Sequence, residues 1–254
     1  MMLTFNGTLP QLGKSPAVLD PRTFKLSDFL SASIPPPPAE VSWVTKVPSW
    51  PVYLNDRIGD CVFAAQAHMI EAWNFYAGHA FQPSNAQVLK AYEDVGGYDP
   101  GNPSSDNGAN LLAALKYWRK TGIGGHKILA FISVNFRNLT EVRQAILLFG
   151  SVYLGVQLPI SAQGEWAWTV PAGGTYTYVG SPGGWGGHCV NLCASSPETH
   201  TCISWGQRLK MSHNFLYDYG DEAFVCLSQD WLDAQGLSPS QFNLAALQTA
   251  LAAL

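Results

Sequence analysis

Three residues of this chain have types and surroundings that could support nucleophilic catalysis: Cys61, His188 and Asn55. Cys61 follows Gly59-Asp60 and begins an apolar stretch with the composition of a buried helix. Because the N-terminus of a helix favours an anion, a cysteine there is readily activated as a thiolate. The imidazole of His188 could remove the thiol proton. The side-chain amide of Asn55 could donate to an oxyanion beside the backbone N–H of Cys61.

Each of the three residues also has a purely structural interpretation. Cys61 could be a small buried hydrophobic side chain, His188 a histidine hydrogen-bonded to a loop at the start of a strand, and Asn55 a turn residue. Taken singly, Cys61 and Asn55 favour the structural interpretation. The case for chemistry therefore depends on the presence of all three in one chain.

Helical patterns dominate the first part of the folded chain. An apolar run that ends at Gly78 predicts a central helix, and a capping box formed by Ser84 and Gln87 opens the next one. Thr140 is expected to cap a later helix. The predicted helices cover residues 61–77, 85–94 and 109–120, and a last one stops at Gly150.

Strand patterns replace the helical ones after residue 150. The candidate strands, separated by glycines and prolines, are 151–158, 173–180, 188–194, 200–205 and 222–228. Helices followed by strands indicate an α+β fold with segregated lobes. We expect the helical lobe at about 55–125 and the β lobe at about 126–232.

Both ends of the chain differ in composition from its centre. Residues 1–39 are rich in proline, including the run 35–38, and are expected to form an arm that wraps the domain or is mobile, without a core of its own. Residues 40–236 would form the main domain. A capping box at Ser238-Pro239-Ser240-Gln241 predicts a C-terminal helix within 237–254, whose leucine stripe would dock on the domain or on a partner.

Taken in order, these motifs resemble those of the papain-like cysteine peptidases. Gly59-Asp60-Cys61 matches the nucleophile turn of that family, Gly187-His188-Cys189-Val190 its histidine strand, and Ser204-Trp205-Gly206 its last motif. Asn55 falls where the family has a glutamine. The resemblance covers about residues 40–232 and is nearest to compact papain-like proteins encoded by bacteria and their phages.

The resemblance implies a two-lobed fold with an active-site cleft between a helical lobe and an antiparallel β-barrel-like lobe. Cys61 would be the nucleophile, His188 the base and Asn55 the oxyanion donor. Trp205 would pack beside His188 and shield it from water. The remaining residues that the resemblance implies are Gly59 and Ser204 as supporting residues, and Asn107, Gly108, Ala109 and Gly187 along the substrate groove.

The sequence departs from the family pattern at positions that matter for catalysis. Ile203 stands where the family has the asparagine that orients the catalytic histidine, and an isoleucine cannot hydrogen-bond an imidazole. Asp221 and Glu222 are weak candidates for that orienting role. Ala109 replaces a glycine whose backbone meets the substrate in the family.

Three functions remain open for such a chain. The first is a cysteine peptidase or related amidase that cleaves peptide bonds through a Cys61–His188 dyad. The second is a catalytically inactive papain-fold protein with a structural or binding role in a larger assembly, such as a phage particle; Ile203 and the proline-rich arm favour it. The third is acyl transfer from the same cysteine to an amine. The presence of both Cys61 and His188 in the family register favours the peptidase.

Composition narrows the range of partners. The formal net charge is −4, and charged residues make up 13% of the chain without a basic block, which argues against nucleic-acid binding. No apolar run reaches the roughly 18 residues of a membrane helix, and no signal peptide is visible. We therefore expect a cytoplasmic or virion-associated protein. Its partners would be a peptide or protein substrate and, through the arm or the C-terminal helix, copies of itself or other proteins.

Neither a cofactor nor a metal is expected from the sequence. Cys189, Cys193 and Cys202 together with His200 could be imagined as zinc ligands, but they lack paired Cys-x-x-Cys spacing. The chain has 5 cysteines, so a complete set of disulfides cannot use them all. Reduced thiols are the expected state.

Overall fold

The structure is a computed structural model that describes residues 2–29, 36–233 and 237–240. It is a mixed α+β fold, which confirms the predicted class. The helices are α1 (Cys61–Ala77), α2 (Asn85–Gly96), α3 (Leu111–Lys120), α4 (Leu139–Phe149) and α5 (His213–Tyr219). The strands are β1 (Val41–Ser42), β2 (Ile128–Ser133), β3 (Val152–Leu158), β4 (Ala167–Trp168), β5 (Gly186–Ser195), β6 (Thr199–Ser204), β7 (Gln207–Ser212) and β8 (Gly220–Ser228).

One sheet forms the centre of the molecule. Its strands follow the order β2-β8-β3-β5-β6-β7-β4, and β1 pairs with β5 from outside this path. The pairs are antiparallel except for β4 with β7. The path does not return to its first strand, so the sheet is open and does not form a closed barrel.

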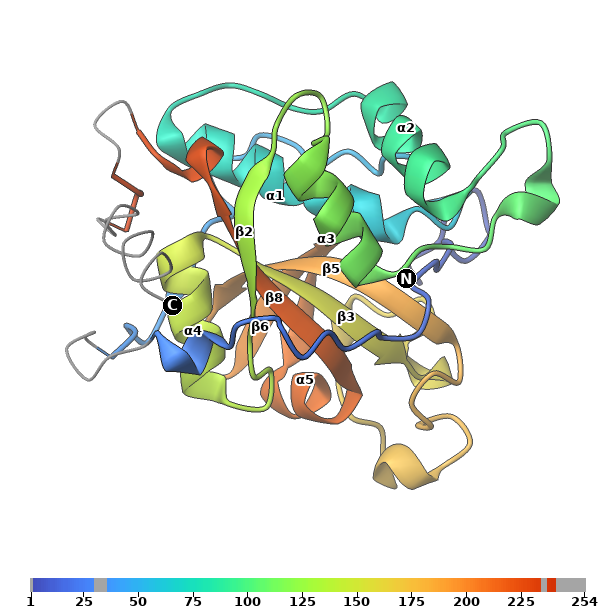
Figure 1. Cartoon of the computed structure of the whole chain (residues 1–254). Coiled ribbons are helices and arrows are strands. Elements are labelled where there is room, and N and C mark those ends of the chain that lie inside the picture. Colours follow the sequence, from blue (N-terminus) through green and yellow to red (C-terminus); the bar gives the residue numbers. More distant parts are fainter. Residues whose placement is uncertain (1, 30–35, 234–236, 241–254) are drawn as a thin grey trace.

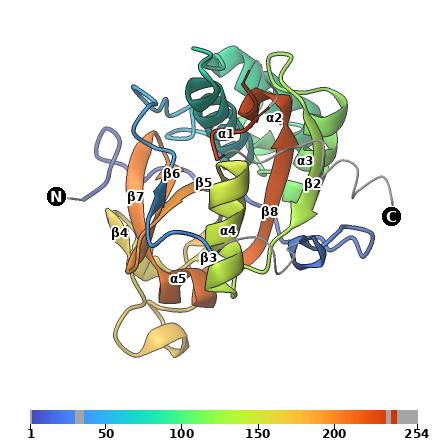
Figure 2. The ribbon, with the colours of Figure 1, turned by 90° about the vertical axis from the view of Figure 1, so that its left-hand side faces the viewer.

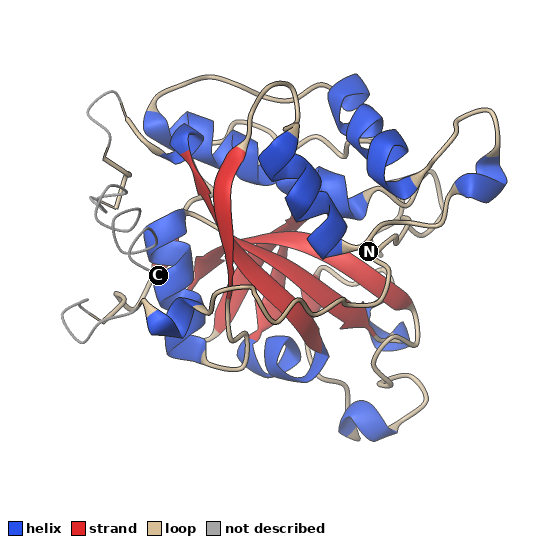
Figure 3. Cartoon of the chain, in the orientation of Figure 1, coloured by secondary structure: helices blue, strands red, loops and turns tan. Residues whose placement is uncertain are grey.

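The helices are divided between the two lobes. Figure 1 and Figure 3 show α1, α2 and α3 together on one side of the molecule, with the sheet and α5 on the other. In Figure 2, which is turned by 90°, α4 stands in front of the sheet, where it packs against β3, β5 and β8. One apolar cluster is centred on α1, α2 and α3 and a second on the sheet with α4 and α5. Because α1 also packs along β5, its first residue meets the strand that carries His188.

Most of the predicted elements are present at the expected places. The central helix ends at Gly78, which has the left-handed conformation (φ 92°) that only glycine adopts without strain. The capping box of Ser84 and Gln87 is formed. Thr140, however, is not a cap: the side chain of Asn138 caps α4 by accepting the backbone N–H of Glu141.

The predicted strand at 173–180 is wrong. This segment contains only a short turn of 3-10 helix at Gly174–Tyr176, and its alternating aromatic residues face solvent, with Tyr176 99% exposed. The segment has the alternating pattern of a strand, but it pairs with no strand of the sheet. Strands β1, β2, β4 and β7 and helix α5 were not predicted. β1 and β4 have only two residues each, and the apolar strand β2 lies among the helices, before the part of the chain in which strands were expected.

The N-terminal arm is part of the folded body. Leu3 and Leu26 are buried and belong to the apolar cluster of the sheet lobe, so the arm wraps the domain and joins its core without forming one of its own. In Figure 1 the arm, in blue, crosses the front of the sheet below α3. The predicted C-terminal helix falls largely on residues 241–254, which lie outside the described residues.

Candidate active site

Cys61 is the first residue of α1 and is only 1% exposed. Burial raises the pKa of its thiol to about 12, although hydrogen bonds from the backbone amides of Cys189 and Gly13 act in the opposite direction. These contacts place the sulfur beside the peptide that joins His188 to Cys189. The N-terminus of the helix therefore does not produce a thiolate in this state, contrary to the expectation from sequence, because the loss of hydration outweighs it.

His188 lies on β5 and is fully buried. Its ring stacks on Trp205, with the ring centroids 4.4 Å apart. Its Nε2 atom is 2.6 Å from Oγ of Ser204, and its Nδ1 atom has no hydrogen-bond partner. A neutral imidazole that donates Nε2–H to Ser204 leaves Nδ1 as the basic nitrogen, which is the atom that would accept a thiol proton.

The residue that orients His188 is the serine after Ile203. Ile203 itself is buried in a small apolar cluster and makes no contribution to the imidazole. Neither carboxylate proposed from sequence takes the orienting role, since both Asp221 and Glu222 pair with Lys14. The chain thus has a polar anchor for the histidine one position later than the family pattern places it. A shift of one residue in a strand reverses the face on which a side chain lies, so sequence spacing alone did not reveal it.

Asn55 is buried and follows two residues in the left-handed region, Tyr53 (φ 55°) and Leu54 (φ 72°). Such backbone is strained for non-glycine residues and persists only where the surrounding structure holds it. The Nδ2 atom of Asn55 donates to the backbone oxygens of Ile58 at 3.0 Å and Gln11 at 3.4 Å. The amide proposed as an oxyanion donor is therefore bound mainly to Ile58 in its own turn, with a longer contact to Gln11 of the N-terminal arm.

The arm lies along the groove that the resemblance assigns to substrate. Ala109 donates its N–H to the oxygen of Gly13 (2.8 Å) and accepts the N–H of Ser15 (2.9 Å), and Lys14 donates its N–H to the oxygen of Gly187 (3.1 Å). Two of the three predicted groove residues on this loop contact the arm: Ala109 does so through these bonds, and a Cβ on Gly108 would lie 2.0 Å from the oxygen of Gly13.

The third predicted groove residue is not part of this contact. Asn107 is exposed, and its side chain donates to Ser104 within its own loop. Gly59, in contrast, meets the arm directly. A Cβ on Gly13 would lie 1.8 Å from the oxygen of Gly59, so both residues must be glycine for the arm to pass.

The arm presents its backbone to Cys61 in an orientation that does not favour attack. The amide of Gly13 hydrogen-bonds the sulfur, and the N–H and C=O groups of a trans peptide point in opposite directions. The oxygen of Leu12 accordingly lies on the side of Gly59. The sulfur therefore meets the edge of the peptide and is not above a carbonyl carbon. No motif in the sequence distinguishes residues 11–14 as part of the site.

The cysteine and the histidine are both neutral in this arrangement. Burial lowers the pKa of His188 to about 3, while that of Cys61 is raised to about 12. The two groups share no hydrogen bond, since Nδ1 of His188 has no partner. The covered site therefore lacks the thiolate–imidazolium pair that nucleophilic attack requires.

The residues considered as zinc ligands are dispersed. Cys189, Cys193 and Cys202 belong to three different apolar clusters. Within residues 2–29, 36–233 and 237–240, no three metal-binding side chains come together. The 5 cysteines are all buried and free.

Comparison with solved structures places the fold in a known class. Xylellain, a cysteine protease from Xylella fastidiosa, superimposes with a TM-score of 0.64 at 13% identity, over 86% of this chain and 96% of that one. The cysteine protease CMS1MS2 from Carica candamarcensis superimposes with a TM-score of 0.55 at 16% identity, over 75% of this chain and 99% of that one. Bromelain from Ananas comosus superimposes with a TM-score of 0.52 at 13% identity, over 75% of this chain and 99% of that one. No family model matches the sequence, and no curated protein matches it.

The chain therefore has the papain-like cysteine peptidase fold. At such low identity the similarity establishes the fold, and the chemistry must be argued from this chain's own residues. Among the helices of the described residues, none has the length and apolar character needed to span a membrane.

Proposed function

We propose that this protein is a cysteine peptidase whose active site is covered by its own N-terminal arm. The observation that carries the proposal is the arrangement at the groove: the thiol of Cys61 lies beside the His188–Cys189 peptide, and Ser204 holds the imidazole with Nδ1 free. The arm supports the proposal as well, because its backbone is hydrogen-bonded to both walls of the groove as a peptide ligand would be.

The chemistry begins once the arm leaves the groove. The Cys61 thiol transfers its proton to Nδ1 of His188, and the sulfur attacks the carbonyl carbon of the peptide. The electron pair of the C=O bond moves to the oxygen, where the amide of Asn55 and the N–H of Cys61 donate to it. Collapse breaks the C–N bond, and the leaving amine takes the proton from His188. Water then attacks the thioester, transfers a proton to Nδ1, and releases the acid as the sulfur recovers that proton.

Ser204 acts through His188 as a positioning residue. Its hydroxyl accepts from Nε2, which fixes the tautomer and the ring plane, and the stacked indole of Trp205 limits rotation and excludes water. This arrangement supplies the function for which Ile203 is unsuitable.

The test is peptide hydrolysis by the full chain with a loosened arm. Lys14→Met removes the charge that anchors the arm and keeps most of its length, so we expect at least about tenfold faster cleavage of a fluorogenic peptide than by the unmodified chain. Cys61→Ala in the same background should abolish it. A chain that remains inert with the arm displaced, as shown by cleavage within residues 11–16 by thermolysin, would overturn the proposal and leave a binding or structural role.

A further inference from the structure

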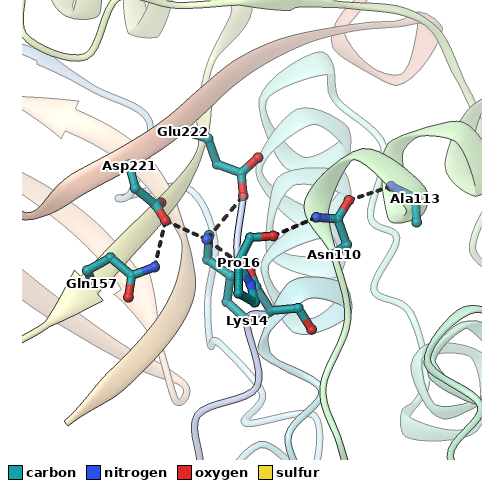
Figure 4. A network of polar contacts seen from close by, with 8 residues as sticks. Lys14, Pro16, Asn110, Ala113, Gln157, Asp221 and Glu222 are labelled. Atoms are coloured by element: carbon teal, nitrogen blue, oxygen red, sulfur yellow. Dashed lines mark hydrogen bonds and ion pairs between the residues drawn. The ribbon is translucent and has the colours of Figure 1, made fainter. Parts of the chain in front are cut away.

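The side chain of Lys14 leaves the arm and enters a pocket in the sheet lobe, where it has no solvent exposure. Figure 4 shows its amine between two carboxylates of β8. Nζ lies 2.6 Å from Oδ2 of Asp221 and 3.1 Å from Oε1 of Glu222, and it also donates to the oxygen of Ser15 at 3.1 Å. Gln157 donates to the same Asp221 oxygen at 2.7 Å and holds that carboxylate in place.

A bulge in the sheet creates this pocket. Gly155 on β3 pairs with Glu222, but the next residue, Val156, pairs with Gly220, so that Asp221 is an extra residue on β8. In a regular strand, adjacent side chains point to opposite faces; a bulge alters the direction of one of them. The bulge therefore allows two consecutive carboxylates to meet the same amine.

The pocket also has space that is shaped for a long side chain. A Cβ on Gly155 would lie 2.4 Å from Cε of Lys14, so the glycine provides the floor on which the methylene stem rests. The two carboxylates also border a cavity of about 490 Å³, whose other walls include the apolar side chains of Leu112 and Phe224 and a part of the arm that contains Lys25. A basic side chain larger than lysine has room on that side.

The amine of Lys14 does not neutralise both carboxylates of the pocket. Two carboxylates face one ammonium group, and Oδ1 of Asp221 and Oε2 of Glu222 have no hydrogen-bond donor. Burial would lower the pKa of Lys14, but the hydrogen bond and charge of Asp221, joined by Glu222, raise it. Burial also raises the pKa of Glu222 against the opposing effect of Lys14. Buried acceptors without donors are costly, so this pocket favours a ligand that carries several N–H groups.

We propose that the pocket formed by Gly155, Gln157, Asp221 and Glu222 binds a lysine or arginine side chain of the peptide that replaces the arm. The inference rests on the proposed function and gives it a substrate class: peptides with a basic residue next to, or one removed from, the bond that is cut. The arm indicates how far this basic residue lies from the bond that is cut, because Gly13 contacts Cys61 and the adjacent Lys14 fills the pocket. Guanidinium groups offer five donors where ammonium groups offer three, so both classes of basic side chain fit the open oxygens.

Rates of peptide hydrolysis measure the preference of the pocket for a basic side chain. The full chain with Lys14→Met is assayed with benzyloxycarbonyl-X-Gly- and benzyloxycarbonyl-Gly-X-coumarin amides, in which X is arginine, lysine, leucine or glutamate. In one of the two series we expect kcat/KM for a basic X to exceed that for leucine about tenfold or more, with glutamate the poorest. Asp221→Asn combined with Glu222→Gln should bring the basic-to-leucine ratio close to one.

Binding tests the pocket without relying on catalysis. The full chain with Cys61→Ala and Lys14→Met is titrated with a labelled peptide of sequence Pro-Gln-Leu-Gly-Lys-Ser-Pro-Ala, which is residues 10–17, and with the same peptide carrying norleucine for lysine. We expect the lysine peptide to bind about tenfold more tightly or better, and the Asp221→Asn, Glu222→Gln variant to remove the difference. Glu40→Lys, a charge change at an exposed position just after the arm and outside the lining of the cavity, is the control for general charge effects.

The outcomes separate the two proposals. Lysine-dependent binding without hydrolysis supports the pocket and overturns the peptidase. Hydrolysis without any preference for a basic residue, together with equal binding of the two peptides, overturns the pocket and leaves the peptidase standing. If Lys14→Met does not fold, as judged by thermal unfolding, Gly155→Ala fills the pocket from its floor and must release the arm; a chain that keeps its arm bound after this change also overturns the inference.

Discussion

At the scale of single residues, the proposed Cys–His mechanism depends on Ser204. Its hydroxyl is the hydrogen-bond partner of Nε2 in a buried imidazole. Serine supplies less reach than the asparagine of the family, but it lies on the strand next to β5, where β6 pairs with it. In the proposed mechanism, Ser204 therefore takes the orienting function that Ile203 cannot supply.

Removing this hydroxyl should expose its role. In the Lys14→Met background, Ser204→Ala should lower kcat by about 10- to 100-fold because the imidazole loses its fixed tautomer and orientation. Ser204→Thr retains the hydroxyl and should recover much of the rate. The pH profile of kcat should also shift in the alanine variant, a change that a merely structural serine would not produce. Unchanged profiles for both variants would remove Ser204 from the mechanism.

The state of the Cys61 thiol is testable by its reactivity. With the thiol pKa at about 12 in the covered site, alkylation of Cys61 by iodoacetamide should increase about tenfold per pH unit from pH 7 to pH 10, without a plateau. Displacement of the arm by Lys14→Met should hydrate the thiol, lower its pKa and accelerate the reaction at pH 7. Peptide mapping by mass spectrometry assigns the rate to Cys61. A plateau below pH 8 in the unmodified chain would show that the thiolate is already stabilised.

At the scale of elements, the arm and the groove fit through glycine contacts. Gly13 passes Gly59 and Gly108 so closely that no Cβ can be accommodated between them. This close approach is what directs the Gly13 amide to the sulfur and the Lys14 side chain to its pocket. A larger residue at position 13 separates the arm from both walls at once.

Gly13→Ala should therefore open the site. We expect an increase in peptide hydrolysis of about tenfold, and faster cleavage of the arm by trypsin, because the methyl group would overlap the backbone of Gly59. Leu19→Ala, at a position of the same arm that is 86% exposed, is the control. Equal behaviour of the two variants would indicate that the arm does not depend on the close approach at Gly13.

At the scale of the whole molecule, the arm stabilises the fold as well as covering the site. Leu26 is 1% exposed and packs in the cluster of the sheet lobe, whereas Leu19 on the same arm is 86% exposed. The apolar residues of a removable inhibitory segment would not need to enter the core. Regulation by this arm is therefore expected to involve local release of residues 11–16, with the neighbouring anchors at Leu3 and Leu26 still in place.

This distinction predicts unequal effects of two leucine substitutions. Leu26→Ala should lower the free energy of unfolding by about 2–5 kcal/mol, because it leaves a cavity in the core. Leu19→Ala should change it by less than about 0.5 kcal/mol. Urea denaturation of the two variants provides the comparison. Equal stability would mean that the arm lies on the surface without contributing to the core.

Local patterns in the sequence were sufficient for much of the fold. The apolar run after Cys61, the glycines that end α1 and α4, and the capping box at Ser84 depend on interactions within a few residues, and the structure contains them all. The fold class followed from the order of helices and strands. The strand predicted at 173–180 failed because a strand needs a partner, and alternation of side chains does not show whether one is present.

Motif order was enough to select Cys61, His188 and Asn55 as candidates; their roles remain predictions. The acidic pocket and the arm in the groove lay beyond sequence reasoning, because each joins segments far apart in the chain. Ser204 was expected as a supporting residue, but its contact with the imidazole was not. Lys14 and Asp221 are separated by 207 positions, and only a bulge in the sheet turns both carboxylates toward the amine. Periodicity reports local geometry, whereas contacts between distant segments and the hydration of a buried thiol are decided by tertiary packing.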